Sequence, residues 1–590
     1  MKSFLKTLLA VVVGIFVAGV LATLCLTCSV VGMAALSADD AVQTEKHDVL
    51  VLNLNDALDE TEPAMPFSFS LLDGLTMDRS LSLRTLLEAI RLGAADPNIE
   101  GIYLSTDGLM AAPASLKALR NALADFKATG KWIVAYNDSY GFGQYYLASV
   151  ADSVFVNPYG SVTLNGMTSL IPYFKGTLDK LGIEMQIFRV GTFKSAVEPY
   201  MQEHMSEANR LQTLTYMQEI WDEYTADIAA SRGLTADTLN AWADRAIGYD
   251  KVSDLPAGLV DGARYRSQME PLVKRMAGQK EDKALHAVTA KQMASTATDK
   301  EQGDRIAVLY AVGDIVDSGS KGETAIVGGD VVRQLGKLAK DKKVKAVVLR
   351  VNSPGGSAFA SEQIWRALMD LKAAGKTLVV SMGDYAASGG YYISAPADYI
   401  FAEPTTITGS IGVFGMIPNF GSVADRIGLS FEEVKTHEYG TLTTFRAATE
   451  AEKARIQHGV EATYATFLSR VSEGRGLTAD SVHTIAQGRV WTGSHALSIG
   501  LVDELGGLSD AVRKAADLAG LTEGKYHTRN YPEAKDPIMA LLEQDNAEDN
   551  VVIRLADQLL GTDRQLERAL RRARSGTRVF ALMEQQPIFE

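Results

Sequence analysis

The feature that most constrains this chain is an internal repeat. The stretch KWIVAYNDSYGFGQYYLASVADSVFVNP (131–158) matches KTLVVSMGDYAASGGYYISAPADYIFAEP (376–404), with one residue inserted in the second copy. The same landmarks then continue in the same order, as SRGLTAD (231–237) and GRGLTAD (474–480) and as GLVD in both copies. Because matching landmarks in one order are typical of a duplicated unit, we expect two similar domains.

Each copy alternates short apolar runs with helical patterns. The runs DVLVLNL (48–54) and RIAVLYAV (305–312) open the two copies, and amphipathic stretches follow each of them. Such alternation predicts an α/β fold in which helices cover a parallel sheet. We therefore expect tandem duplicated α/β domains, with the following boundaries: an N-terminal repeat domain (46–272), a linker (273–303), a C-terminal repeat domain (304–525) and a partly helical tail (526–590).

The N-terminus predicts a membrane anchor over residues 1–38. Lys2 and Lys6 come first, and no charged residue follows from Thr7 through Ala38. A bilayer-spanning helix needs about 20 apolar residues, whereas the apolar core of a cleavable signal has about 7–15. We therefore expect an uncut transmembrane helix with its lysines in the cytoplasm and the body outside. A long signal that is cleaved remains the alternative.

Composition excludes several classes of function. The net charge of -14 argues against nucleic-acid binding, which needs clustered Lys and Arg. The only cysteines, Cys25 and Cys28, lie in the apolar N-terminal run, so the body has no disulfide and no thiol nucleophile. The eight histidines form no HExxH pattern, and we expect neither a metal nor another cofactor.

Comparing the two copies identifies candidate catalytic residues. When the paired tyrosines are aligned, Ser388 in GDYAASGGYYIS (383–394) falls opposite Phe142 of the first copy. With the same offset, Lys194 in FRVGTFKSAVEPY falls opposite Gly440. The first copy thus has the lysine without the serine, and the second has the serine without the lysine. This is the pattern expected when a duplicated enzyme divides one site between its halves.

These residue types suit nucleophilic catalysis. A serine hydroxyl attacks well only when a neighbouring base removes its proton, and a neutral lysine can do this. Burial between two domains would lower the lysine pKa from about 10.4 toward the working pH. An acyl-transfer site also needs donors for the oxyanion. The backbone N–H of Gly389 is one candidate, and Gly355 or Gly356 of the loop RVNSPGGSA (350–358) is the second.

These motifs resemble the signal peptide peptidase A (protease IV) family of serine peptidases, family S49, in its long double-domain bacterial form. The likeness rests on SPGG, DYAASGGYYI with Ser388, TTITGSIGV (405–413) and VGTFKSAVEP with Lys194. It implies a crotonase-like and Clp-protease-like α/β fold, a Ser-Lys dyad, and Ser410 as a hydrogen-bond partner of the lysine.

The resemblance also implies how and where such an enzyme works. It implies a homotetrameric ring attached to the lipid bilayer of the bacterial inner (cytoplasmic) membrane, single-pass, with catalytic domains on the periplasmic side. The implied substrates are signal peptides that remain in the membrane after secretion, and other short apolar peptides.

Other readings of the residues stay open. His437, which lies near Gly440 in the second copy, could replace the lysine as base of a Ser-His hydrolase. A non-catalytic membrane scaffold with the same fold is a second alternative. A crotonase-type hydratase would use acidic groups for proton transfer, and no obvious pair of such groups is present.

Overall fold

The computed structural model describes residues 43–62, 67–70, 74–77, 81–297, 303–319, 325–440, 442–533 and 579–582. The predicted anchor (1–38) and the predicted helix of the tail lie outside these residues. Among the helices that are described, none is long and apolar enough to cross a bilayer.

The first repeat folds around a sheet of six parallel strands. Its strands are, in spatial order, β8 (Gly262–Ala263), β6 (Ser153–Val156), β5 (Trp132–Asn137), β4 (Ile99–Ser105), β1 (Asp48–Asn53) and β9 (Ala287–Thr289). Successive strands are joined through helices, which is the connection that parallel strands require. This confirms the α/β class predicted from the alternating pattern.

The second repeat folds around a sheet of eight strands. Its main path is β19 (Val490–Thr492), β17 (Ile407–Gly409), β15 (Thr377–Ala387), β13 (Val344–Ser353), β10 (Asp304–Val312) and β21 (Tyr526–Tyr531), with β16 (Tyr399–Ala402) and β20 (Glu504–Leu505) branching from β15. All pairs in it are parallel except β17 with β19.

Matching hydrogen bonds show that the two repeats share one fold. The Tyr145 hydroxyl donates to the carbonyl of Leu259, and the Tyr391 hydroxyl donates to the carbonyl of Leu501. Both acceptors belong to the GLVD landmark. The aligned landmarks therefore occupy the same place in each domain.

The predicted linker and the predicted tail each contribute a strand to a main sheet. β9, from the predicted linker, pairs in parallel with β1 at the edge of the first sheet. β21, at the start of the predicted tail, pairs in parallel with β10 at the corresponding edge of the second. β9 and β21 therefore occupy corresponding edge positions in the two sheets. These strands were missed because their sequences carry no long apolar run.

A third sheet joins the two repeats. Its order is β12 (Ala325–Val327), β11 (Asp314–Val316), β14 (Gly355–Ser357), β22 (Val579–Leu582), β18 (Val413–Asn419) and β7 (Glu184–Val190). β7 comes from the first repeat and pairs antiparallel with β18 of the second over seven residues. A separate hairpin is formed by β2 (Phe67–Ser70) and β3 (Gly74–Met77).

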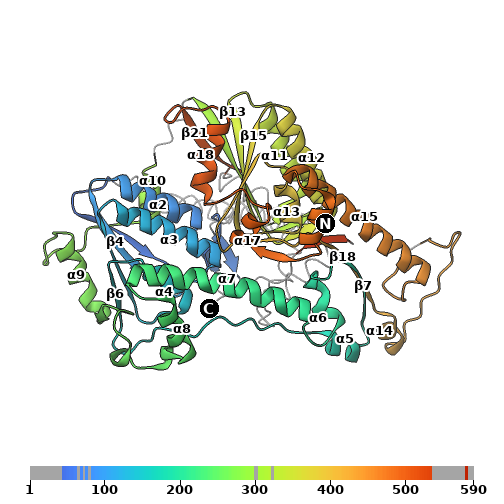
Figure 1. Cartoon of the computed structure of the whole chain (residues 1–590), viewed down its shortest axis with the longest axis horizontal. Helices are drawn as coiled ribbons and strands as arrows, with labels where there is room; N and C mark the ends of the chain where they lie inside the picture. Colours follow the sequence, from blue (N-terminus) through green and yellow to red (C-terminus); the bar gives the residue numbers. More distant parts are fainter. Residues whose placement is uncertain are drawn as a thin grey trace, which may run out of the picture.

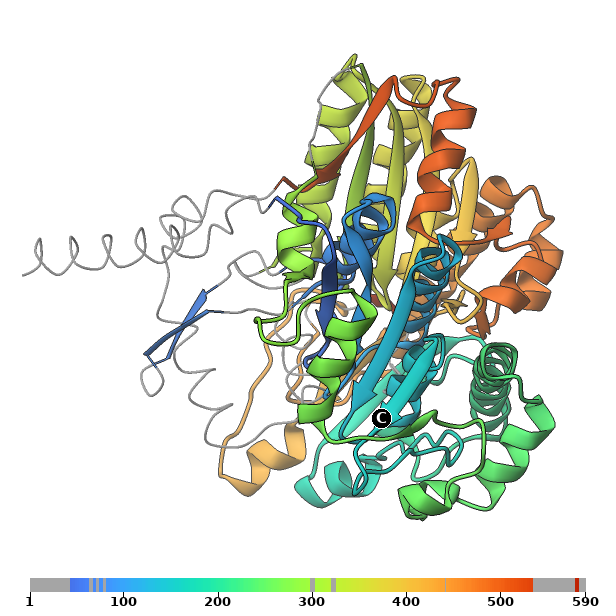
Figure 2. The ribbon, with the colours of Figure 1, turned by 90° about the vertical axis from the view of Figure 1, so that its left-hand side faces the viewer.

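Helices surround the sheets (Figure 1). Those of the first repeat are α2 (Leu83–Ala95), α3 (Pro113–Ala128), α4 (Phe142–Ala148), α5 (Lys175–Leu181), α6 (Glu198–Met201), α7 (Glu207–Arg232), α8 (Ala236–Asp244), α9 (Met269–Met276) and α10 (Ala290–Ser295). Those of the second are α11 (Gly328–Lys340), α12 (Ala358–Ala373), α13 (Gly389–Ser394), α14 (Gly421–Arg426), α15 (Glu450–Arg475), α16 (Ala479–Ile485), α17 (Gly493–Ser498) and α18 (Leu508–Leu518). The turned view in Figure 2 shows the sheet of the second repeat above that of the first, and α3 of the first repeat lies against β15 of the second.

The apolar core of the first repeat extends into the second repeat. The core of the first repeat includes Tyr385 and Ala387 of β15 and Ile407 of β17, which belong to the second repeat. The strand that leads to Ser388 therefore packs against both domains, and this shared packing fixes how one repeat sits against the other.

Candidate active site

Ser388 lies at the turn between β15 and α13, and it is fully buried. Its φ of 55° is positive, which is rare for a residue with a side chain and costs of order 1–3 kcal/mol. Its backbone N–H donates to the carbonyl of Gly409, which holds the turn in place. Strain of this kind persists where the surrounding structure enforces it, and it is concentrated at functional sites.

Lys194 reaches Ser388 from the other repeat. It follows β7, whose last residue, Val190, pairs with Val413 at the start of β18. The ladder between β7 and β18 thus brings the lysine to the end of β18 that follows Ser410. Lys194 Nζ is 2.8 Å from Ser388 Oγ.

The surroundings of Lys194 disfavour its charged form. The side chain is 1 % exposed, and burial lowers its pKa well below the ordinary value of 10.5. Desolvation penalises the ammonium because its hydration is lost, and this is the cause of the lowered pKa. An amine in this setting is available as a neutral base at a lower pH than an exposed lysine.

Ser410 provides both remaining partners of the amine. Lys194 Nζ lies 3.0 Å from Ser410 Oγ and 3.1 Å from the Ser410 carbonyl oxygen. Ser410 is also buried and has a positive φ of 51°. The contact that the resemblance implied is thus present in the structure.

Sequence reasoning missed a loop that packs directly on Lys194. The Phe193 N–H donates to the carbonyl of Gln487, and the Gly488 N–H donates to the carbonyl of Ile411. A Cβ on Gly488, whose φ is +78°, would come 2.6 Å from the backbone of Lys194, so only glycine fits this position. Nothing in the sequence signalled this contact, because the loop lies almost 300 residues after the lysine.

The candidate oxyanion glycines lie on two segments. Gly389 is the first residue of α13, so its N–H has no acceptor within that helix. Gly355 and Gly356 are the first two residues of β14, and the Gly355 N–H donates to Ser353 Oγ at 3.2 Å. Ser353 pairs with Ala386 of β15, which places this loop beside the strand that carries Ser388.

A short strand occupies the slot between β14 and β18. β22 pairs antiparallel with β14, Leu582 opposite Gly355, and antiparallel with β18, Phe580 opposite Phe414. An extended chain therefore fits beside the candidate oxyanion loop. The sequence did not predict this strand.

The structure does not bring His437 to the site. It lies on an exposed loop with its Nδ1 atom 3.0 Å from Thr436 Oγ1, whereas Ser388 Oγ is in contact with Lys194. Gly440, which aligns with Lys194, lies on the same exposed loop.

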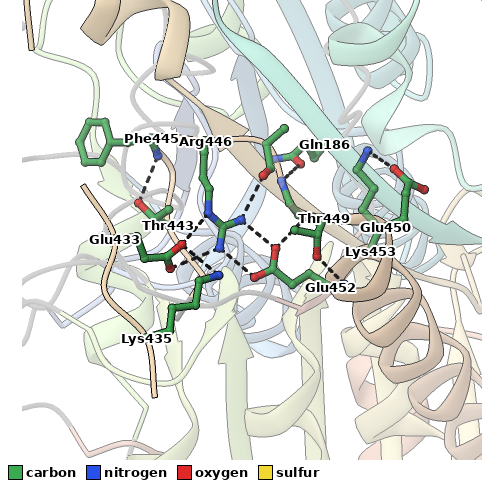
Figure 3. Close-up of polar contacts among 12 residues, drawn as sticks. Gln186, Glu433, Lys435, Thr443, Phe445, Arg446, Thr449, Glu450, Glu452 and Lys453 are labelled. Carbon is green, nitrogen blue, oxygen red and sulfur yellow. Dashed lines mark hydrogen bonds and ion pairs between the residues drawn. The ribbon is translucent and has the colours of Figure 1, made fainter. Parts of the chain in front are cut away.

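That loop belongs to a projection that we call the arm (residues 420–440 and 442–447), at the right of Figure 1. Arg446 ties the arm to α15 through Glu452, at 2.8 and 2.9 Å, and contacts Glu433 within the arm (Figure 3). The Ala448 N–H, just after the arm, donates to Gln186 of β7.

Comparison with known proteins agrees with this geometry. The model of peptidase family S49 matches residues 125–281 and 370–522, one match in each repeat. The chain belongs to peptidase family S49. It is accordingly a serine peptidase that hydrolyses peptide bonds.

Curated relatives span most of this S49 chain. It is 37% identical over 485 residues to Protease 4 of Haemophilus influenzae, covering 80% of this chain and 78% of that protein. It is 38% identical to Protease 4 of Salmonella typhi, with 78% and 75% covered. The chloroplastic serine protease SPPA of Arabidopsis thaliana is 30% identical, with 82% and 72% covered.

A second family model refines the fold of this S49 peptidase. The Clp protease model matches residues 308–407, which contain the second half of β10, all of β13 and β15, and the turn at Ser388. The second repeat is thus a Clp-protease-like α/β domain, and the duplication extends this architecture to the first.

Proposed function

We propose that this S49 peptidase is a membrane-anchored endopeptidase whose Ser-Lys dyad is split between its repeats. Ser388 is the nucleophile and Lys194 is the general base. The single observation that carries the proposal is the 2.8 Å separation of Lys194 Nζ from Ser388 Oγ, from opposite repeats.

The number of hydrogen-bond partners around the Lys194 amine supports these roles. A neutral amine has two N–H groups and one lone pair. If both N–H groups donate to Ser410, to its carbonyl oxygen and its hydroxyl, the lone pair is left for the Ser388 O–H. Ser410 thereby orients the base, which is the role of the third member in comparable triads.

The reaction then follows from this arrangement. Ser388 Oγ attacks the peptide carbonyl carbon while Lys194 Nζ takes the hydroxyl proton. The tetrahedral oxyanion receives hydrogen bonds from the N–H of Gly389 and of Gly355 or Gly356. When the intermediate collapses, the C–N bond breaks and the Lys194 ammonium gives its proton to the leaving amine. Water, deprotonated by the same lysine, then hydrolyses the acyl-enzyme.

The slot between β14 and β18 supports an extended substrate. A peptide that entered it antiparallel to β14 would gain main-chain hydrogen bonds on both sides, as in other cases of strand addition. β22 demonstrates that backbone of this shape fits. We propose remnant signal peptides and other short apolar peptides as substrates.

The remaining parts of the proposal concern assembly and location. We propose a single-pass anchor at residues 1–38 in the bacterial inner membrane, catalytic domains on the periplasmic side, and a homotetramer. Exposed apolar side chains on the arm, Ile427, Phe431 and Val434 among them, are candidates for contacts between copies. Light scattering of the solubilised chain measures the number of copies.

The proposal is tested by covalent labelling of the full-length, detergent-solubilised protein with a serine-reactive phosphonate. We expect labelling at Ser388, none in Ser388→Ala, and at least a hundredfold slower labelling in Lys194→Ala. Lys274→Ala is the matched control, because Lys274 is also largely buried but pairs with Glu270 far from Ser388 in sequence. Full labelling of Lys194→Ala, together with its loss in a His437→Ala variant, would favour the Ser-His alternative.

A further inference from the structure

The strand that carries Ser388 changes its neighbour shortly before the nucleophile. Residues Val379 to Ser381 of β15 pair with β16, but Tyr385 to Ala387 pair with β17. β17 leads directly into Ser410, which holds the amine of Lys194. The switch from β16 to β17 is therefore what brings the hydroxyl and the amine to the same place.

A bulge produces this switch. Opposite β13, Val351 pairs with Met382 and Ser353 pairs with Ala386, so that three residues of β15 (383–385) face Asn352 alone. Extra residues of this kind bend a strand and re-aim the side chains that follow it. Any change in the bulge therefore alters the direction in which Ser388 leaves the sheet.

Side chains replace the ladder hydrogen bonds that the bulge interrupts. Asn352 Oδ1 accepts from the Tyr385 N–H at 3.1 Å, and Asn352 Nδ2 donates to Asp384 Oδ2 at 3.1 Å. The Thr406 hydroxyl donates to the carbonyl of Gly383 at 2.8 Å. Each residue of the bulge thus has a polar contact that holds it.

Asp384 connects the bulge to the first repeat. Its Oδ1 accepts from the Ser115 backbone N–H at 2.7 Å and its Oδ2 from the Ser115 hydroxyl at 2.7 Å. Ser115 is in the first turn of α3, whose N-cap residue, Ala112, offers no side-chain acceptor. The carboxylate of the second repeat therefore satisfies a free N–H at the start of a helix of the first.

We propose that Asp384 and Ser115 are positioning residues, which hold the bulge of β15 so that Ser388 points at Lys194. This rests on the proposed function, because it assigns a purpose to the bulge only if Ser388 and Lys194 react together. The Ser115–Asp384 contact then adds to the contacts that Lys194 makes across the repeats, and it lies four residues before Ser388 in the chain.

Neither residue touches the reacting atoms, so their effect is on geometry. A misplacement of about 1 Å in a nucleophile costs up to about 10²-fold in rate. Ser115→Ala removes one of the two hydrogen bonds and keeps the backbone one. Asp384→Asn keeps the size of the side chain but replaces one of the two carboxylate oxygens with an NH₂ group, which cannot accept a hydrogen bond. Depending on which oxygen is replaced, either the Ser115 N–H or the groups that donate to Oδ2 lose their acceptor.

The test compares phosphonate labelling rates and peptide turnover in the full-length, detergent-solubilised protein at 25 °C. We expect Ser115→Ala to slow Ser388 labelling about tenfold and Asp384→Asn about 10²-fold. The loss should appear in kcat while KM changes less than twofold, because the peptide slot between β14 and β18 is untouched. Ser149→Ala is the matched control, since Ser149 is fully buried in the first repeat and bonds Arg120 and Tyr146 instead.

Each outcome decides the inference. Labelling of Ser115→Ala at the wild-type rate overturns it, as does equal slowing in Ser149→Ala, which would mean that any loss of a buried hydroxyl loosens the site. If Asp384→Asn does not fold, as judged by circular dichroism and thermal melting, Ser115→Ala alone decides. Failure of the proposed function is a different result, namely that wild type is not labelled at Ser388 or that Lys194→Ala is labelled normally.

Discussion

Replacing Lys194 with methionine separates the two consequences of burying an amine. Methionine matches the apolar stem of the lysine side chain and removes the titratable amine. Burial holds the pKa of Lys194 well below 10.5 in the folded chain, whereas in the unfolded chain it is about 10.4. Between these two pKa values the unfolded chain binds a proton that the folded chain does not.

The sign and size of the effect follow from proton linkage. Within that window the free energy of unfolding of the wild type rises with pH by about 1.4 kcal/mol per pH unit, because the unfolded state binds more protons. Below the lowered pKa both states are protonated, and above about 10.4 neither is, so the dependence vanishes at both ends. The methionine variant lacks this term. The free energy of unfolding of the wild type minus that of the variant therefore rises by about 1.4 kcal/mol for each pH unit inside the window.

The same substitution removes the base. Without it, we expect phosphonate labelling of Ser388 to slow by about 10²–10⁴-fold, the usual contribution of a general base. In the wild type the labelling rate rises with pH until Lys194 is neutral and then levels off. The variant should show no such rise.

Two measurements on the full-length solubilised protein check this: guanidinium unfolding at a series of pH values, followed by tryptophan fluorescence, and labelling rates at the same values. Lys274→Met serves as control for the loss of a buried lysine and should be labelled at the wild-type rate. The reasoning fails if the difference in unfolding free energy between wild type and Lys194→Met is constant with pH, or if the variant is labelled normally.

Three further predictions follow from other contacts. Ser410→Ala should slow Ser388 labelling about tenfold or more, since one of the two acceptors that orient the Lys194 amine is lost; a rate within twofold of wild type would contradict this. A chain ending at Arg578 should cleave apolar peptides faster than the full chain, because β22 no longer fills the slot beside β14, and unchanged turnover would show that β22 does not compete with substrate. At low pH the arm should loosen, because hydrogen bonds from Arg446 lower the pKa of Glu452 to about 2. The pair therefore stabilises the arm above about pH 4.5, and this stabilisation is lost as the pH falls toward 2. Hydrogen exchange in the arm measures the loss, and the core strand β13 should stay unchanged.

Much of the site was predictable because duplication supplies an internal control. Aligning the copies paired Ser388 with Phe142 and Lys194 with Gly440, and this complementary loss identified both residues before their separation was known. In the structure the Phe142 ring stacks on Trp221, so this position of the first repeat serves apolar packing. A difference between two copies of one fold carries chemical information that a single copy lacks.

Other parts of the site had no local signal. Asp384 and Ser115 are 269 positions apart, and nothing in either stretch indicates that they meet. The loop at Gly488 is equally remote from the lysine it packs on. Periodicity and propensity report on neighbours within a few residues, so contacts formed when two domains close on one another lie beyond their reach.

The order of residues by itself determined that this chain is two copies of an α/β unit, with a hydroxyl in one and an amine in the other. Those are local properties: apolar runs, small residues around a serine, and a repeat of landmarks. Only the tertiary structure decided that the two groups face one another, because their approach depends on a ladder between β7 and β18 and on a bulge in β15. The ladder consists of hydrogen bonds between the repeats, and Ser115 of the first repeat bonds to Asp384 in the bulge. Such bonds exist only once the domains have packed together.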